Sequence, residues 1–206
     1  MSGRVAAILL AAGKSRRMGC CKQLLPLGET TVIGRCLETL IAAGIGEIVA
    51  VVSSEGHEVA EEARKYTVTI VVNSHPEGDM ASSVRTGRDA LPQDTTGVVV
   101  TLCDHPLVLP ATISRLVEEH SRSPGSIIIP CHDRRSGHPL LFPRSVLDEL
   151  AGDLTLRDLV RRDPDRVCRL DVPDPGVLLD MDTPDEYRRV FDLAEAHPHG
   201  RKEHSQ

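Results

Sequence analysis

The residues near the amino terminus that are best suited to chemistry form a short cationic loop after an apolar run. Residues 5–10 are all aliphatic, and Ala11, Ala12, Gly13 and Ser15 follow them. Small side chains let backbone N–H groups approach an anionic ligand closely. The cations of this stretch are Lys14, Arg16, Arg17 and, shortly beyond them, Lys22. The loop therefore predicts a triphosphate site, although a glycine turn with solvated arginines would explain the same residues without a ligand.

Two better-known phosphate motifs do not fit this loop. Gly13-Lys14-Ser15 is similar to the end of a Walker A loop, but that motif needs a glycine where this chain has Ile8. The G-x-G-x-x-G pattern of dinucleotide sites is also missing. A P-loop phosphotransferase, which would cleave at the γ-phosphate, is therefore disfavoured.

Carboxylates follow two segments that lie far apart in the sequence, and they could hold a divalent metal ion. Asp104 stands directly after the apolar stretch 97–103, and Asp182 precedes a Thr-Pro pair that should begin a helix. Mg²⁺ prefers oxygen ligands such as these. Both positions also suit ordinary turn or helix capping. The residues alone leave metal binding and capping open for each carboxylate.

Apolar runs of strand length alternate with amphipathic stretches along the chain, and these elements would position the loop and the carboxylates. We expect strands at residues 5–10, 47–52, 67–72, 97–103, 126–130, 139–142 and 166–170, and helices at 31–43, 56–65, 80–91, 110–120, 144–150, 154–162 and 183–196. The polar segment 131–138 should be a hairpin or a long loop. This order predicts a Rossmann-like, doubly wound α/β fold with a mostly parallel sheet and helices on both faces. Ligands of such sheets bind beyond the carboxyl ends of the strands.

Length and composition indicate one domain with an aliphatic core. The chain has 206 residues, of which 40% are hydrophobic and only 2% aromatic, so Val, Ile, Leu and Ala must form the core. We expect the domain to cover residues 1–196 and the polar tail 197–206 to be disordered. The net charge of −6 argues against a nucleic-acid-coating protein, because phosphate neutralisation needs clustered Lys and Arg.

The cysteines and the first apolar run predict a cytoplasmic protein with reduced thiols. The run has six residues, too few for a signal peptide or a membrane span, so no membrane partner is expected. None of the six cysteines forms a C-x-x-C pair. Zinc binding through Cys20-Cys21 or Cys131-His132 is disfavoured, because adjacent ligands without a second pair are poor zinc spacing.

Several short motifs occur in a specific order along most of the chain. They are Leu10-Ala11-Ala12-Gly13 with Ser15, Arg17-Met18-Gly19, Lys22-Gln23-Leu24-Leu25-Pro26-Leu27, Asn73, Gly78-Asp79-Met80, Ser82-Ser83, Cys103-Asp104-His105-Pro106, Gly137-His138-Pro139 with Phe142, Gly152-Asp153 and Asp180-Met181-Asp182-Thr183-Pro184. In this order they resemble the molybdenum cofactor nucleotidyltransferases related to MobA, and most of all the cytidylyltransferase (MocA-like) branch. The resemblance extends from residue 5 to about residue 191.

The resemblance implies a fold of the nucleotide-diphospho-sugar transferase type and a Mg²⁺-dependent reaction. CMP would pass from CTP to the terminal phosphate of molybdopterin, with release of pyrophosphate. Arg17, Lys22 and Asp104 are implied as catalytic residues, and Asp104 and Asp182 as the metal ligands. The implied nucleotide-binding residues are Leu10, Ala11, Ala12, Gly13, Lys14, Ser15, Arg17, Lys22, Asn73, Gly78, Met80, Ser82 and Ser83. The implied acceptor side is Gly137, His138 and Pro139, and a molybdoenzyme or its insertion chaperone is a further implied partner.

Some residues leave alternatives open. Ala12 in place of glycine favours CTP, yet a GTP-using enzyme remains an alternative, as does an enzyme of this architecture acting on a sugar or polyol phosphate. A non-catalytic nucleotide-binding module would be expected to lack one of the charged residues that this chain retains. His138 could hydrogen-bond the acceptor or only order its own turn. Arg157, Arg161 and Arg162 could contact a phosphate-bearing acceptor or a partner protein, or form an exposed helix face, which we favour. Cys20 and Cys21 have no assigned role.

Overall fold

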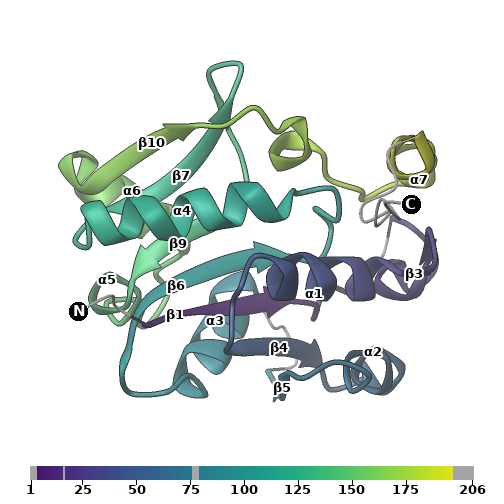
Figure 1. Cartoon of the computed structure of the whole chain (residues 1–206). Helices are drawn as coiled ribbons and strands as arrows, with labels where there is room; N and C mark the ends of the chain where they lie inside the picture. Colours follow the sequence, from purple (N-terminus) through teal and green to yellow (C-terminus); the bar gives the residue numbers. More distant parts are fainter. Residues whose placement is uncertain (1–3, 16, 76–78, 197–206) are drawn as a thin grey trace, which may run out of the picture.

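The computed structural model describes residues 4–15, 17–75 and 79–196. Within that part of the chain, one sheet of eight strands runs through the molecule in the order β10-β7-β9-β6-β1-β4-β5, with β8 paired to β7 (Figure 1). Its strands are β1 (Arg4–Leu10), β4 (Ile48–Ser53), β5 (Thr69–Asn73), β6 (Thr95–Leu102), β7 (Ile127–His132), β8 (Arg135–Ser136), β9 (Leu140–Pro143) and β10 (Val167–Asp171). A separate small hairpin joins β2 (Pro26–Leu27) to β3 (Thr30–Thr31).

Helices cover both faces of the sheet, as the sequence predicts. They are α1 (Val32–Ala42), α2 (His57–Ala63), α3 (Met80–Asp89), α4 (Pro110–Arg122), α5 (Arg144–Leu147), α6 (Leu156–Arg162) and α7 (Pro184–Ala196), with 3₁₀ turns η1 (Lys22–Leu24), η2 (Pro164–Arg166) and η3 (Pro175–Leu178). Figure 1 shows α1 and α4 on the near face and α3 behind the strands. Within these described helices, none is long and apolar enough to cross a lipid bilayer.

The alternation of side chains along β1 explains why helices cover both faces of the sheet. Ala7 and Leu9 pack into one cluster with residues of α1, α2, α4 and α7, whereas Ala6 and Ile8 pack into a second cluster with residues of α3, α5 and α6. Successive side chains of a strand point to opposite faces, so a strand that is aliphatic at every position must be covered on both. The continuous apolar run therefore encodes a central strand.

The segment between β7 and α5 departs from the expected arrangement. The turn after β7 is tight, with Asp133 and Arg134 at positive φ, and it returns as the short strand β8. Strand β9 does not simply complete a hairpin with β7. It lies between β7 and β6 and pairs antiparallel with both, which makes the sheet mixed at this point.

Smaller differences concern element ends. Helix α5 ends at Leu147, because the amides of Glu149 and Leu150 bond to carbonyls three residues earlier and form turns. The turn η1 and the β2–β3 hairpin have no counterpart in the expected elements. The prediction of a disordered tail at 197–206 lies outside the described residues.

Candidate active site

The cationic loop and Asp104 begin side by side, because they follow neighbouring parallel strands. Leu10 at the end of β1 is in register with Leu102 at the end of β6. The Cys103 amide donates to the Leu10 carbonyl at 3.1 Å, which extends the pairing by one residue. The carboxyl ends of parallel strands are where ligands bind in such sheets. The sheet therefore places both segments at one edge.

A buried glutamine holds the loop in shape. Gln23 is 2% exposed. Its Nε2 donates to the carbonyl oxygens of Ala11 (3.0 Å) and Gly13 (2.8 Å), and its Oε1 accepts from Ser15 Oγ at 3.2 Å. Ser15 has a φ of +47°, a conformation that needs such support outside glycine. Gln23 was not among the expected site residues. The sequence pointed to it only through the motif of residues 22–27, in which it follows Lys22.

The two candidate metal ligands converge on one cation. Lys22 Nζ donates to Asp104 Oδ2 at 2.9 Å and to Asp182 Oδ1 at 2.7 Å. Arg17 Nη2 donates to the other oxygen of Asp182. The segments are tied together directly, since the Met181 amide donates to the Asp104 carbonyl at 3.0 Å. Carboxylates 78 positions apart in the sequence thus face the same point.

The charges of this cluster support one another. Burial lowers the pKa of Lys22, but the attraction of Asp104 and Asp182 outweighs it, and the net pKa is raised. The hydrogen bond from Lys22 lowers the pKa of Asp182, and Arg17 acts in the same direction. Lys22 is therefore a cation and Asp182 an anion at neutral pH. Lys22 lies between the carboxylates, whereas the resemblance implied that it would face the triphosphate.

The donor set around Asp104 fits a hard divalent cation. Asp104 Oδ1 is buried and has no hydrogen-bond partner among the described residues, which is costly for a carboxylate oxygen. No group of three or more His, Cys, Asp and Glu residues that could hold a metal occurs within residues 4–15, 17–75 and 79–196. Mg²⁺ does not require one, because it usually takes one or two carboxylates and completes its shell with phosphate and water.

A pocket of about 170 Å³ opens beside this cluster. It is lined by Leu10, Ala12, Gly13, Lys22, Gln23, Asp79, Met80, Ser83, Leu102, Cys103 and Asp104. Six of the expected nucleotide-binding residues line it, and six other described ones do not: Ala11, Lys14, Ser15, Arg17, Asn73 and Ser82. Gly78 lies outside the described residues.

Asn73 supports the pocket from behind. It is buried and does not line the pocket, and its Nδ2 donates to Ser82 Oγ (2.8 Å) and Ser83 Oγ (2.9 Å). Asp79 lines the pocket and caps α3 by accepting from the Ser82 amide at 2.7 Å. These contacts fix the first turn of α3, and with it Met80 and Ser83, at the pocket wall.

A second pocket, of about 330 Å³, adjoins the first and shares Met80 and Leu102 with it. We call it the acceptor pocket; it is lined by Met80, Val100, Leu102, Ile129, Ser136, Gly137, His138, Leu140, Leu156, Arg157 and Val160. A side chain at Gly137 would come within 2.3 Å of the Val177 carbonyl, which explains the glycine. Of the three residues expected on the acceptor side, Gly137 and His138 line this pocket, whereas Pro139 does not. The peptide bond between His138 and Pro139 is cis.

With the site described, comparison with known proteins assigns the chain to a family. The family described as the MobA-like NTP transferase domain matches residues 7–167. The chain belongs to the MobA-like NTP transferase family. Its fold is that of the nucleotide-diphospho-sugar transferases, which confirms the fold class predicted from the sequence.

Relatives of this MobA-like protein carry varied names. The nicotine blue oxidoreductase of Paenarthrobacter nicotinovorans is 30% identical over 91% of this chain and 96% of the relative. The molybdenum cofactor cytidylyltransferase of Escherichia coli (strain K12) is 26% identical over 87% of this chain and 92% of the relative. A crystal structure of Rv0371c from Mycobacterium tuberculosis H37Rv has a TM-score of 0.80 at 32% identity and covers 93% of this chain and 99% of that one.

A second Rv0371c structure is a complex with manganese. Its TM-score is 0.72 at 27% identity, and it covers 93% of this chain and 100% of that one. A structurally similar protein has therefore been seen with manganese.

The buried imidazole of His138 should stay neutral in the physiological range. Burial lowers the pKa of His138 to about 4, and repulsion from His105, whose ring centroid is 5.0 Å away, acts in the same direction. The unfolded chain, with a pKa near 6.5 at this residue, therefore binds the proton more readily. We therefore expect the free energy of unfolding to fall, through this residue, as the pH falls from about 6.5 towards 4.

NMR titration of the histidine ring signals, assigned with His138→Gln, measures this pKa. Unfolding in denaturant at pH 7 and pH 5 measures the accompanying loss in the free energy of unfolding. This loss should be smaller in the variant. An ordinary pKa for His138 in the folded protein would contradict the expectation.

Proposed function

We propose that this MobA-like nucleotidyltransferase transfers CMP from CTP to the terminal phosphate of molybdopterin and releases pyrophosphate. The observation that carries the proposal is the convergence of Asp104 and Asp182 on one cation, beside a pocket at the carboxyl ends of β1 and β6. The similarity to the molybdenum cofactor cytidylyltransferase of Escherichia coli supports the choice of substrates.

The residues of the cluster suit a reaction between two polyanions. A phosphate monoester has a second pKa of about 6, so the nucleophile is largely ionised at neutral pH and needs no general base. Catalysis is then mainly a matter of positioning and charge. Arg17 and Lys22 would turn from the carboxylates to the triphosphate and stabilise the pyrophosphate that leaves.

Asp104 and Asp182, once released by these cations, would hold Mg²⁺. The ion, when bound, supplies positive charge that offsets the charges of the two phosphates. The unpartnered Asp104 Oδ1 supports this assignment, because a metal would satisfy it.

The acceptor pocket favours a flat heteroaromatic acceptor over a polyol. Most of its walls are aliphatic side chains, among them Val100, Ile129 and Val160. A sugar or polyol phosphate would leave hydroxyl groups without partners against these walls, which is costly. The Nδ1 atom of His138 is buried without a partner among the described residues and could bond a ring nitrogen or oxygen of the acceptor. Arg157 lines the same pocket and is exposed, so it is placed to meet the acceptor phosphate.

A screen of pyrophosphate release tests both substrates. The purified protein with Mg²⁺ is given CTP, GTP or ATP, each with molybdopterin, glucose 1-phosphate or methylerythritol phosphate. We expect release above background with CTP and molybdopterin, and weaker release with GTP. Faster release with a sugar or polyol phosphate would refute the proposed acceptor, and faster release with GTP would assign the protein to guanylyl transfer instead.

A further inference from the structure

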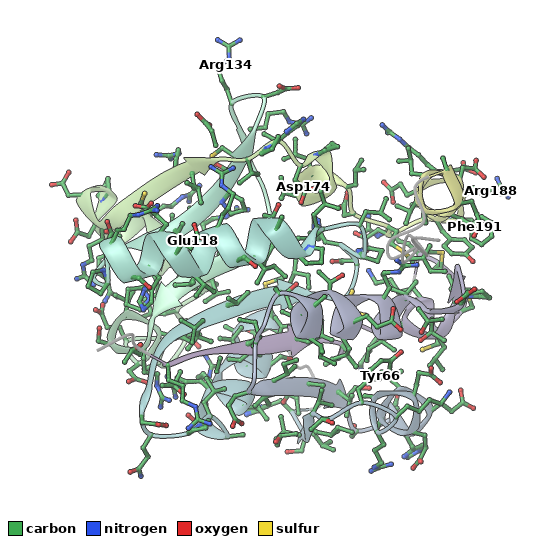
Figure 2. All side chains as sticks on the ribbon, viewed as in Figure 1. Tyr66, Glu118, Arg134, Asp174, Arg188 and Phe191 are labelled. Atoms are coloured by element: carbon green, nitrogen blue, oxygen red, sulfur yellow. The ribbon has the colours of Figure 1, made fainter. Side chains whose placement is uncertain are left out.

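A third cavity, of about 400 Å³, lies apart from the two pockets of the active site and shares no lining residue with them. We call it the α7 cavity; it is lined by Arg35, Leu107, Leu109, Asp174, Pro175, Gly176, Leu179, Leu193 and Ala194. These residues come from α1, the segment before α4, η3 and its flanks, and α7. Figure 2 shows Asp174 on the short turn between α4 and α7.

The acidic side chain among the described lining residues of the α7 cavity already bonds to other groups of the protein. Asp174 is 2% exposed. It accepts hydrogen bonds from the Leu109 amide (2.9 Å), Thr112 Oγ1 (2.6 Å) and the Gly176 amide (2.9 Å). These bonds tie the start of α4 to η3 and make the cavity wall rigid. Both oxygens of the carboxylate are therefore already bonded within the protein and are not free to bond a ligand.

The basic side chain among the described lining residues has, in contrast, a buried donor atom that is not hydrogen-bonded. Arg35 is half-buried on α1, and its Nε is buried without a hydrogen-bond partner among the described residues. A buried donor without an acceptor is destabilising, and a ligand that accepts from it would remove that cost. Guanidinium groups are always charged and match a carboxylate with two parallel bonds.

We infer that the α7 cavity binds a small carboxylate with a compact apolar body. The carboxylate would pair with Arg35, and the apolar part would lie against Leu107, Leu179 and Leu193. Small-molecule sites are typically apolar cavities of about 300–1,000 Å³ with a few polar groups that orient the ligand, which is the composition found here. A sugar or a nucleotide does not suit these walls, because most of its hydroxyl groups would stay unpaired.

Isothermal titration of the full chain with 2-naphthoate, without nucleotide or metal, tests the inference. We expect saturable binding at one site. Arg35→Met and Leu193→Glu should each weaken it by about tenfold or more, the first by removing the cation and the second by adding a repelling charge. The neutral amide 2-naphthamide should bind wild type about tenfold more weakly than the acid.

Arg188→Met is the matched control, since Arg188 lies on α7 and is 73% exposed, paired with Asp185 (Figure 2). This variant should bind 2-naphthoate as wild type does. Absence of saturable binding, or equal affinity in wild type, Arg35→Met and Leu193→Glu, would overturn the inference. Amide shifts confined to Ala12 and Gly13 on titration would overturn it too, by placing the ligand in the nucleotide pocket.

Discussion

Replacing Asp104 with asparagine should lower the turnover of nucleotidyl transfer by roughly 10²-fold or more, the scale for losing one positioned electrostatic group. Asparagine keeps the size of the side chain but removes its charge. Asp104 follows the end of β6. One of its oxygens binds Lys22, and the other is buried without a hydrogen-bond partner among the described residues and lies 3.9 Å from His105 Nε2. A neutral amide there would both weaken metal binding and release Lys22 from one of its two carboxylates.

Steady-state pyrophosphate release at saturating CTP, molybdopterin and Mg²⁺ measures this effect. Circular dichroism with thermal unfolding checks that the variant folds. Asp94→Asn is the matched control, because Asp94 pairs with Arg4 at the opposite end of β6 and is 64% exposed. The control should keep near-normal turnover. Near-normal turnover in Asp104→Asn would remove this carboxylate from the mechanism.

Replacing Lys22 with methionine should produce opposite effects on metal binding and on turnover. Lys22 Nζ lies between Asp104 and Asp182, the two carboxylates that we propose as metal ligands. A metal ion added alone must displace it. We therefore expect Mn²⁺ without nucleotide to bind the variant about tenfold more tightly or better, whereas turnover falls by roughly 10²-fold, because the triphosphate loses a cation.

Stability should follow the same logic. Without Lys22, two carboxylates face each other with less compensation, so the free energy of unfolding should fall by about 1–3 kcal/mol, a range discounted for their partial exposure. Added Mn²⁺ should restore it in the variant and change wild type little.

Calorimetric titration with Mn²⁺ and unfolding curves with and without the ion provide the measurements. Lys65→Met is the control, since Lys65 pairs with Glu62 on the surface and is 66% exposed. Equal Mn²⁺ affinity in wild type and Lys22→Met would show that the ammonium does not compete for the metal position.

The local pattern of the sequence was sufficient to predict the sheet and most of its helices. Residues 5–10 are aliphatic at every position, and only a strand covered on both faces can bury all of them. Helix boundaries followed from residues with local effects, such as Thr183, whose Oγ1 accepts from the Glu186 amide at the start of α7. Because these effects act within a few residues, the sequence contains them in readable form.

The antiparallel position of β9 could not be predicted in the same way. Its four residues are apolar, but nothing local tells whether they pair with β7 alone or enter between β7 and β6. That choice depends on which neighbours remain unpaired after the rest of the sheet has formed. It matters for function, because Leu140 of this strand lines the acceptor pocket.

By itself, the sequence determined which residues have the chemistry for a nucleotide and a metal and at which edge of the sheet they would gather. Only the tertiary structure decided their partners: Gln23 beneath the loop, Lys22 between the two carboxylates, and Arg35 unpartnered in the α7 cavity. The physical reason is range. Strand burial and helix capping are local, whereas hydrogen bonds between different segments, such as those from Lys22 to Asp104 and Asp182, exist only after the chain has packed.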